Sequence, residues 1–403
     1  MPWGLRMLLM FALAGGLFQL YVARKTITAL STVTQWPRRR VRLSAIALSV
    51  WTILYPLLMI GSYLFGFDQV PQAFQRADLT RDALFTYPFW IGVIFSIQAG
   101  LLFLIMDAIR LLLFPLYKKH KVRWLKLQSL IVIAIAAVGL VYVIARIYSD
   151  TFTVRTRETE LRVRNLPAEL DGFRIAQIAD VQADGRTGDS KLQRYVDQVN
   201  RLEPDIILFG GDLVTGGTDY IETGAQAISR MQANYGVYAC LGDHDFFSNS
   251  EKVSRSLKEN GITLLDNAAK LVPVGSTQIA LTGITNTYRT RLTTATLDAV
   301  EQGRQQGPVN ILLTHQPSEW LVDYAAGHRY DLFVAGHTHG GQIAFPLPGF
   351  LLTGSSFETH YVTGFYKAGD MLVSITNGLG LTLAPIRYQA PAEVTLITLR
   401  AAQ

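Results

Sequence analysis

Asp and His residues follow directly after short apolar runs at five places in the second half of the chain. The clearest is residues 331–342, DLFVAGHTHGGQ, where His337 and His339 come one residue apart after the apolar stretch 332–335. The other four are IADVQ at 178–182, GGDLV at 210–214, GDHD at 242–245 and LLTHQP at 312–317. Carboxylate oxygens and imidazole nitrogens without thiolates suit Mn, Fe or Zn in a hydrolytic site. The set predicts a metal-dependent hydrolase.

The apolar runs before these residues have the length of buried β-strands. We expect strands at 174–179, 205–209, 237–241, 278–282, 310–314 and 331–335, and a helix at 190–202. In that helix Leu192, Val196 and Val199 recur at helical spacing, whereas residues 155–164, rich in Arg and Glu, are interpreted as a connector. Strands that alternate with helices predict an α/β domain, and in such sheets sites form beyond the carboxyl ends of the strands.

In this order, the five motifs resemble the five blocks of the calcineurin-like metallophosphoesterases. The usual pattern of that family is Asp-x-His, Gly-Asp, Gly-Asn-His-Asp/Glu, a single His, and Gly-His-x-His. The resemblance covers roughly residues 155–400 and extends to NGLG at 377–380 and APIRYQAPAEVTLITL at 384–399. Those details look like the bacterial membrane-associated phosphodiesterases and the transmembrane proteins with a metallophosphoesterase domain. The resemblance implies two mixed β-sheets flanked by helices.

The resemblance also implies a role for each motif residue at a centre for two divalent metal ions (Mn, Fe or Zn). The first ion would be held by Asp180, Gln182, Asp212 and His339. The second ion would be held by Asp212, Asp243, His315 and His337, with Asp212 bridging the two. His244 would protonate the leaving group, with Asp245 beside it to orient the imidazole.

Such a centre has a physical rationale for hydrolysis of phosphate mono- or diesters. Two ions about 3.5–4 Å apart can hold the phosphate, generate a hydroxide that attacks it, and stabilise both the attacking and the leaving oxygen. An imidazole beside a leaving alkoxide can act as a general acid near neutral pH. The motifs do not distinguish a monoesterase from a diesterase.

Two residues depart from the family pattern. Gln182 stands where the first block usually has His, and Asp243 stands where the third usually has Asn. The Gln oxygen is a weaker metal ligand than imidazole, whereas Asp243 adds a negative charge and removes an amide donor. A catalytically weak or inactive metal-binding sensor or binding module on the same fold is therefore the alternative function.

Three further residues are excluded from the predicted site. His328 and His360 are interpreted as ordinary loop histidines, and Asp184 as a turn residue before Gly185. The single cysteine, Cys240, rules out an internal disulfide and is expected to be a buried core residue.

The first part of the chain has the composition of a membrane region. Apolar stretches at 5–22, 43–65, 87–106 and 125–144 each have close to the ~20 residues that a membrane-spanning helix needs. The first stretch could be a signal peptide that ends at 12–14, but its basic residues mostly follow the apolar run, which favours a retained span. We predict a four-span transmembrane region at 1–148 and a calcineurin-like metallophosphoesterase domain at 149–403.

Charge predicts the orientation of the four spans in a cell (inner) membrane. Lys and Arg gather in the loops after the first and third spans, whereas the middle loop has only Arg76 and Arg81, opposed by three Asp. By the positive-inside rule those two basic loops are cytoplasmic, and the domain after the fourth span is extracytoplasmic. Asp107 and Arg110, three residues apart, are interpreted as an interfacial pair, so we expect an anchor rather than a transporter.

The distribution of charge along the chain also indicates which binding partners to expect. The first 150 residues hold 16 of the 37 Lys and Arg but only 5 of the 31 Asp and Glu, so the predicted domain is mildly acidic. That argues against nucleic acid, and the expected partners are the bilayer and a phosphate ester. Related branches point to lipid-linked esters such as UDP-diacylglucosamine, although a cytoplasmic nucleotide-linked precursor would lie on the wrong side of the membrane. The sequence gives no oligomeric state.

Overall fold

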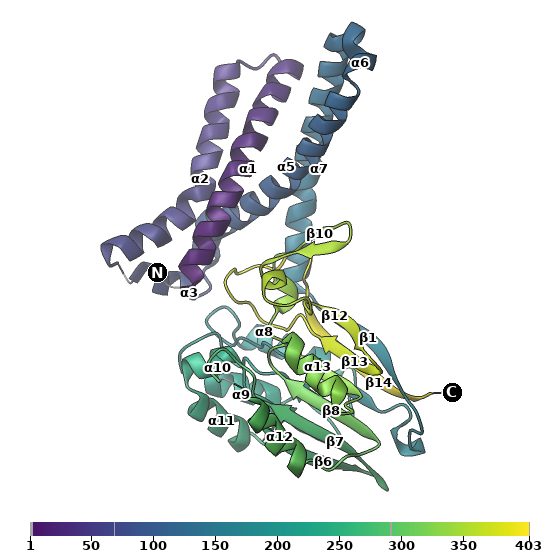
Figure 1. The fold of residues 1–403 in the computed structure, drawn as a ribbon. Helices are drawn as coiled ribbons and strands as arrows, with labels where there is room; N and C mark the ends of the chain where they lie inside the picture. Colours follow the sequence, from purple (N-terminus) through teal and green to yellow (C-terminus); the bar gives the residue numbers. More distant parts are fainter. Residues whose placement is uncertain (1–2, 68, 291, 403) are drawn as a thin grey trace. The chain divides into compact units, whose positions relative to one another are not determined.

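The computed structural model describes residues 3–67, 69–290 and 292–402 (Figure 1). The chain divides into two compact units, Met1–Tyr148 and Ser149–Gln403. The first unit is helical, and the second is built from sheets and helices.

Four long helices dominate the first unit. They are α1 (Trp3–Val33), α2 (Arg38–Phe65), α5 (Tyr87–Leu112) and α7 (Lys121–Phe152), whose last turn belongs to the second unit. Short elements join them: α3 (Gln69–Gln75), α4 (Leu79–Arg81), the π-helix η1 (Asp82–Thr86), α6 (Phe114–Tyr117) and η2 (Lys118–His120). All four long helices are apolar enough to cross a membrane, and large apolar side chains such as Leu17 and Val141 are exposed on them. The four predicted spans are confirmed, and the chain is a multi-pass membrane protein.

Asp107 has hydrogen-bond partners other than the one expected from its spacing to Arg110. Its carboxylate accepts from the hydroxyl of Tyr21 at 2.7 Å and from the ammonium of Lys25, both on α1. A carboxylate and an ammonium within a membrane region stabilise each other when they meet across a helix interface. The pair therefore joins α1 to α5, which fits an anchor.

Two mixed six-stranded sheets form the second unit, as the resemblance implied. The first has the order β1 (Val154–Val163), β14 (Ala392–Ala401), β2 (Arg174–Ile178), β3 (Ile206–Phe209), β4 (Val237–Ala239) and β5 (Thr263–Leu264). The second has the order β12 (Gly364–Ala368), β13 (Met371–Ile375), β9 (Leu332–Ala335), β8 (Val309–Thr314), β7 (Thr277–Ile284) and β6 (Ala268–Val274). A separate antiparallel hairpin consists of β10 (Phe345–Leu347) and β11 (Phe350–Leu352).

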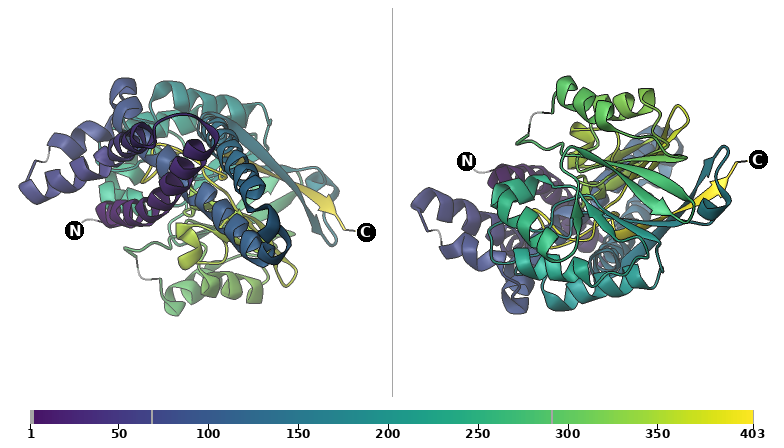
Figure 2. Two further views of the ribbon diagram at one scale, coloured as in Figure 1. Left: turned by 90° about the horizontal axis from the view of Figure 1, so that it is seen from above. Right: turned by 90° about the horizontal axis from the view of Figure 1, so that it is seen from below.

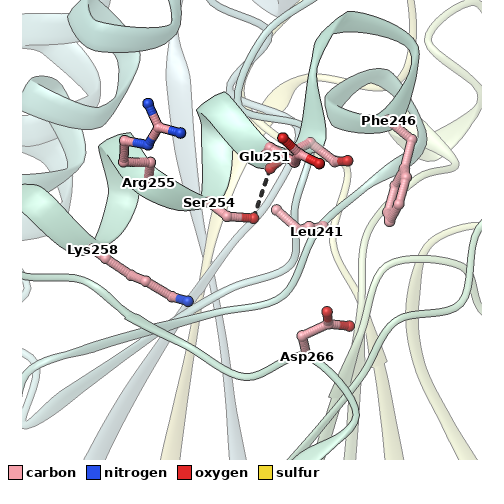
Figure 3. A pocket seen from close by; sticks show the side chains of 8 residues that line it. Leu241, Phe246, Glu251, Ser254, Arg255, Lys258 and Asp266 are labelled. Carbon is pink, nitrogen blue, oxygen red and sulfur yellow. Dashed lines mark hydrogen bonds between the residues drawn. The ribbon is translucent and has the colours of Figure 1, made fainter.

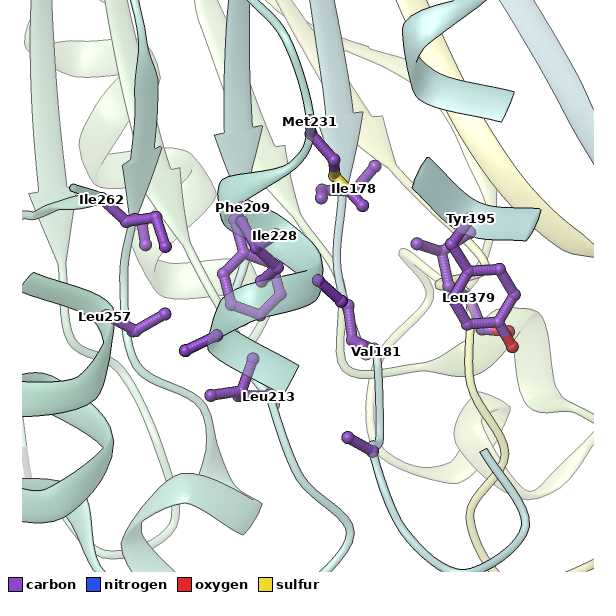
Figure 4. Close-up of a cluster of buried hydrophobic side chains, with 14 of the residues drawn as sticks. Ile178, Val181, Tyr195, Phe209, Leu213, Ile228, Met231, Leu257, Ile262 and Leu379 are labelled. Atoms are coloured by element: carbon purple, nitrogen blue, oxygen red, sulfur yellow. The ribbon is translucent and has the colours of Figure 1, made fainter. Parts of the chain in front are cut away.

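Alternating side chains of each strand supply different cores, because successive residues point to opposite faces of a sheet. Ile206 and Leu208 of β3 belong to the core between the two sheets, which also contains the buried Cys240. Ile207 and Phe209 face the other way, into a core with α8 (Asp189–Asn200), α9 (Ile221–Ser229) and α11 (Ser250–Glu259) (Figure 4). A third core packs α12 (Thr294–Gly303) and α13 (Glu319–Gly327) on the second sheet. The unit is thus a four-layer α/β sandwich.

The predicted strands are present within one or two residues, but one predicted connector is itself a strand. Residues 154–163 form β1, which pairs in parallel with β14 from Val154 to Val163 (Figure 2). As an edge strand β1 leaves most of its Arg and Glu side chains in solvent, and Arg157 forms an ion pair of 2.7 Å with Glu393. An edge strand with one solvated face lacks the apolar run that identifies a buried strand from sequence.

Candidate metal centre

The candidate ligands lie where strands of both sheets end. Asp180 and Gln182 follow β2, Asp212 follows β3, and the α10 helix (Asp243–Ser248) begins with Asp243 after β4. In the second sheet His315 follows β8, and His337 and His339 follow β9. The side-chain amide of Gln177 on β2 donates to the carbonyl of Ala335 on β9 at 2.8 Å, which ties the two sheets together directly before the site.

Two groups of ligand atoms form at these ends, each with its atoms within 4.8 Å of one another. One consists of Asp180, Asp212 and His315, and the other of Asp243, His315 and His337. The Nε2 atom of His315 lies between them, 3.4 Å from Oδ2 of Asp212 and 3.6 Å from Oδ2 of Asp243. His337 Nδ1 lies 3.0 Å from Oδ2 of Asp243. The structure therefore brings together carboxylates and imidazoles of the type that hold two adjacent cations.

The two remaining predicted ligands lie at the edge of the first group. His339 places Nε2 3.5 Å from Oδ1 of Asp180. The amide of Gln182 donates to Oδ2 of Asp212 at 2.9 Å. All seven predicted ligands thus occupy one site, and Asp212 touches both the Gln182 side and the His315 side of it.

Five of the seven candidate ligands have left-handed backbone conformations, which are uncommon for residues with a Cβ atom. The φ angles are 53° at Asp180, 50° at Gln182, 60° at Asp212, 70° at His337 and 52° at His339. Such angles cost energy and persist where the surrounding structure enforces them, typically at functional sites. The strand ends are therefore bent to aim these side chains at one point.

Glycines make room for the carboxylate of Asp180. A Cβ atom on Gly336 would lie 2.6 Å from Oδ2 of Asp180, and one on Gly378 would lie 2.6 Å from its Cβ atom. Gly378 also has a φ of 66°, which favours glycine. Any side chain at either position would displace Asp180 from the site.

Comparisons with known proteins agree with this geometry. Residues 173–341 match the family model of the calcineurin-like phosphoesterases. The uncharacterized metallophosphoesterase YkoQ of Bacillus subtilis (strain 168) is 30% identical over 199 residues, which are 47% of this chain and 71% of that protein. The chain belongs to the calcineurin-like metallophosphoesterases.

Further similar proteins include a membrane protein. The transmembrane protein with metallophosphoesterase domain of Danio rerio is 31% identical over 289 residues, which are 68% of this chain and 63% of that relative. The chain thus spans less than two thirds of that relative's length. A solved structure of TT1561 from Thermus thermophilus aligns with a TM-score of 0.37 at 11% identity, over 51% of this chain and 90% of that one.

Electrostatics divide the histidines of this metallophosphoesterase site into two kinds. Burial alone would lower the pKa of His337, but the carboxylates of Asp243 and Glu358 outweigh it and raise the pKa to about 9. Burial would also lower the pKa of His315. The carboxylates of Asp212 and Asp243 outweigh burial and raise this pKa well above its usual range. At His339 burial and the nearby Arg387 hold the pKa well below the ordinary value. Two imidazoles therefore sit in a strongly negative environment that a cation would neutralise.

The pKa of Asp243 is lowered by the same two histidines whose pKa values it raises. Burial would raise this pKa, but hydrogen bonds from His315 and His337 outweigh it and keep the carboxyl well below its usual range. Tyr288 N–H and the Gln316 amide also donate to this carboxylate, at 2.8 and 2.9 Å. The surroundings of Asp243 thus favour its charged form, where an Asn of the usual family pattern would be neutral.

Buried polar atoms without a hydrogen-bond partner are a further sign that the site could hold metal ions. Among the residues described, the Oε1 atom of Gln182 and the Nδ1 atom of His339 are buried without a hydrogen-bond partner. A buried polar atom without a partner is costly and calls for an explanation. The residues present fit divalent cations, which this family typically binds in pairs.

His244 is held by a carbonyl and not by Asp245, contrary to the role expected of that carboxylate. The Nδ1 atom of His244 lies 2.6 Å from the carbonyl oxygen of Thr215. Asp245 is fully buried and accepts from the backbone N–H groups of Gly242, Asp212 and Leu213 at 2.9–3.0 Å. Asp245 therefore fixes the loop of Asp212 against that of Gly242, and Thr215 orients the imidazole.

Arg387 is a buried residue of the site that the motif pattern did not single out. Its guanidinium donates to the carbonyls of His339 at 3.2 Å, Gly378 at 3.2 Å and Gly380 at 2.7 Å, among others. These carbonyls belong to the segments that carry His339 and pack against Asp180. The signal in the sequence was that this arginine is the only charged residue of the stretch 384–392.

Three residues excluded from the predicted site make other contacts. Asp184 accepts from the backbone N–H groups of Arg186 and Thr187 at 2.7 Å, the turn role expected of it. His360 is exposed and pairs with Glu319 at 3.0 Å. His328 is not merely solvated, since its ring stacks on Tyr324 and its Nδ1 atom lies 2.7 Å from the Tyr324 carbonyl.

A pocket of about 520 Å³ lies beside α10 and α11, apart from the candidate ligands (Figure 3). Its wall includes Phe246, Arg255, Lys258 and Asp266. Phe246 follows Asp245 in α10, so the pocket borders the helix that carries His244. The residues that line this pocket carry charges of both signs and do not form a recognisable catalytic arrangement.

Proposed function

We propose that this protein is a membrane-anchored phosphoesterase that hydrolyses phosphate mono- or diesters at a centre for two divalent metal ions. The observation that carries the proposal is the meeting of Asp180, Asp212, Asp243, His315 and His337 at the ends of strands from both sheets. Membership of the calcineurin-like family supports the reaction class. The unusual backbone angles of the ligands support a site under functional constraint.

The candidate ligands would divide between two ions, and Asp212 would contribute to both. The first ion would be held by Asp180, Gln182, Asp212 and His339, and the second by Asp212, Asp243, His315 and His337. When bound, the pair of ions supplies the positive charge that holds a phosphate and activates water. The carbonyl oxygen of Gln182, buried without a donor, is suited to the first ion.

The protein's own contribution to bond cleavage is the proton of His244. Because Nδ1 is engaged by the carbonyl of Thr215, the imidazole presents Nε2 to the leaving group. The backbone N–H of His244 donates to Oδ1 of Asp212 at 2.8 Å, which fixes the distance of this residue from the ligands. Asp245 holds the two loops together through the three backbone hydrogen bonds that it accepts.

The membrane region suggests the class of substrate. The loop charges support an extracytoplasmic position of the catalytic domain. A phosphate ester carried by a lipid would be confined to the same membrane as the enzyme. We therefore favour lipid-linked esters on that face over soluble cytoplasmic nucleotides.

The full chain, purified in detergent, provides the test. Elemental analysis should find about two divalent ions per chain, and chromogenic mono- and diesters should be hydrolysed in a metal-dependent manner. Asp212→Asn, which removes the shared charge, should lose both metal and turnover. A folded, metal-loaded wild-type chain without turnover on any ester would instead identify a metal-binding sensor or binding module.

A further inference from the structure

The segment between His339 and Glu358 has no charged residue over positions 340–357 and exposes large apolar side chains. It contains the β10–β11 hairpin, whose turn is Pro348-Gly349. Phe350 on β11 is 59% exposed, and Phe357 beyond it is 84% exposed. Leu352 is also exposed. Soluble domains rarely leave such side chains together in water without a partner.

The root of this hairpin is bound to the segment 384–389. The backbone N–H of Ala344 donates to the carbonyl of Tyr388 at 3.0 Å, and the rings of Phe345 and Tyr388 lie 5.8 Å apart. The amide of Gln342 donates to the carbonyls of Ala384 and Ile386 at 2.7 and 3.0 Å. The hairpin is therefore a fixed projection of the second unit.

The same segment holds the end of the last membrane helix. The backbone N–H of Arg387 donates to Oγ1 of Thr151 at 2.9 Å, and that of Gln389 donates to Oδ2 of Asp150 at 2.7 Å. Thr151 and Asp150 belong to the last turn of α7. One hydrogen-bonded segment thus separates the hairpin from the end of a helix that crosses the membrane.

Helix geometry limits how far this region can lie from the bilayer. The apolar stretch of α7 ends at Ile144, and Asp150 is six residues later, or about 9 Å along the helix axis. The headgroup layer on each side of a bilayer is about 5–8 Å thick. A hairpin of this length reaches about 10 Å from its root at ~3.3 Å per residue. Phe350, which pairs with Leu347 next to the turn, can therefore reach the lipid surface.

We propose that the β10–β11 hairpin, with Phe357 beyond it, is a membrane-binding surface whose partner is the bilayer that the four helices span. The surface has the chemistry of the interface, with aromatic and aliphatic tips and no charge that would have to be desolvated. Because the second unit is linked to a membrane helix, the bilayer is the partner that this surface meets at a high effective concentration.

This membrane-binding surface also suggests a substrate class for the proposed phosphoesterase, and this step rests on that proposed function. Glu358 directly follows Phe357, and its Oε2 atom lies 3.3 Å from Nε2 of His337 in the candidate metal centre. Insertion of Phe357 would bring that side of the centre to the headgroups. The substrate class that fits is a lipid phosphate ester that the enzyme takes directly from the membrane surface.

Fluorescence tests the membrane contact without any need for activity. Cys240, the single cysteine, is buried, so Leu352→Cys in the full chain can carry one environment-sensitive dye. In nanodiscs with one protein copy, the dye should emit as in an apolar medium, be quenched by nitroxide lipids and be shielded from iodide. Ser229→Cys, at the exposed end of α9, is the matched control and should behave in the opposite way. Equal behaviour at both positions, or shielding of 352 only with two copies per disc, overturns the proposal.

Rates on a soluble and a membrane-bound ester then distinguish a role of the hairpin in membrane binding from a role in catalysis. The variant with both Phe350→Ser and Leu352→Ser should hydrolyse a soluble chromogenic ester like the wild type. Its turnover of a phosphatidyl ester in vesicles should fall by roughly tenfold or more, as loss of a buried aromatic side chain implies. Equal losses on both substrates contradict a role in membrane binding. A wild-type chain that is inactive on both would refute the proposed function alone, because the fluorescence result stands independently.

Discussion

The side-chain amide of Gln182 donates a hydrogen bond of 2.9 Å to Oδ2 of Asp212, the carboxylate that we propose as a ligand of both metal ions. In the usual family pattern an imidazole occupies the position of Gln182. The amide therefore takes up one lone pair of Asp212 and offers only a neutral oxygen, Oε1, in return. We therefore expect the first metal position to be the weaker of the two.

Gln182→His should strengthen that position. An imidazole nitrogen is a better ligand for Mn, Fe or Zn than an amide oxygen, so we expect metal affinity of the first position to rise by roughly tenfold or more. Titration calorimetry with Mn²⁺ or Zn²⁺ measures the change. Gln316→His is the control, because Gln316 bonds Asp243 on the other side of the site. Unchanged affinity in the first variant would show that Gln182 is not a ligand.

Acidification should weaken metal binding, because protons compete for the same imidazoles. Neighbouring carboxylates raise the pKa of His337 to about 9 and also raise the pKa of His315, so protons compete with a metal ion at both imidazoles. Metal binding must release these protons, and the affinity should rise by about one to two decades per pH unit between pH 6 and 8. Calorimetry in buffers of different ionisation enthalpy counts the released protons. Binding without proton release would contradict the assignment of these two residues as ligands.

Removal of each of two histidines should have different effects. His244→Ala should keep both metals while turnover falls by about 10²–10⁴-fold, with a smaller loss for esters that have a good leaving group. His337→Ala should lose metal from the second position together with activity, whatever the leaving group. Elemental analysis and rates on a pair of esters that differ in leaving-group pKa distinguish the two. If His244→Ala strips the metals, the proton donor is another residue.

Arg387→Met should loosen the first half of the site. The change removes the guanidinium donors to the buried carbonyls of Gly380, Asn377 and Ala390. The carbonyls of His339 and Gly378 also lose Arg387 but keep the backbone N–H groups of Gln342 and Glu393 as donors. Each buried carbonyl left without a donor costs about 1–3 kcal/mol, so the melting temperature should fall clearly. The metal of the first position should be lost before that of the second. Arg387→Lys, which keeps the charge but fewer donors, should be intermediate, and two variants with wild-type stability would contradict this role.

The meeting of the candidate ligands could be predicted from the sequence, whereas the residues that support them could not, for physical reasons. Asp180, Asp212, Asp243, His315, His337 and His339 follow short apolar runs, so their common location could be predicted from the rule that α/β sites form at strand ends. The role of Thr215 could not, because it acts through a backbone carbonyl, which every residue has. Likewise β1 was missed because its solvated face carries Arg and Glu. Arg387 acts through carbonyls contributed by distant turns, and no local pattern encodes that contact.

The side of the membrane on which the metal centre lies can be tested with topology reporters. Basic residues gather at 38–42 and 118–126, so these two loops should be cytoplasmic. A reporter fused after residue 403 should be active only outside the cytoplasm, and one inserted at 38–42 only inside. Replacement of the four Arg at 38–42 by Gln should weaken this preference, since the charge bias sets the orientation. The reverse pattern would place the centre in the cytoplasm, where nucleotide-linked lipid precursors would become the substrates to test first.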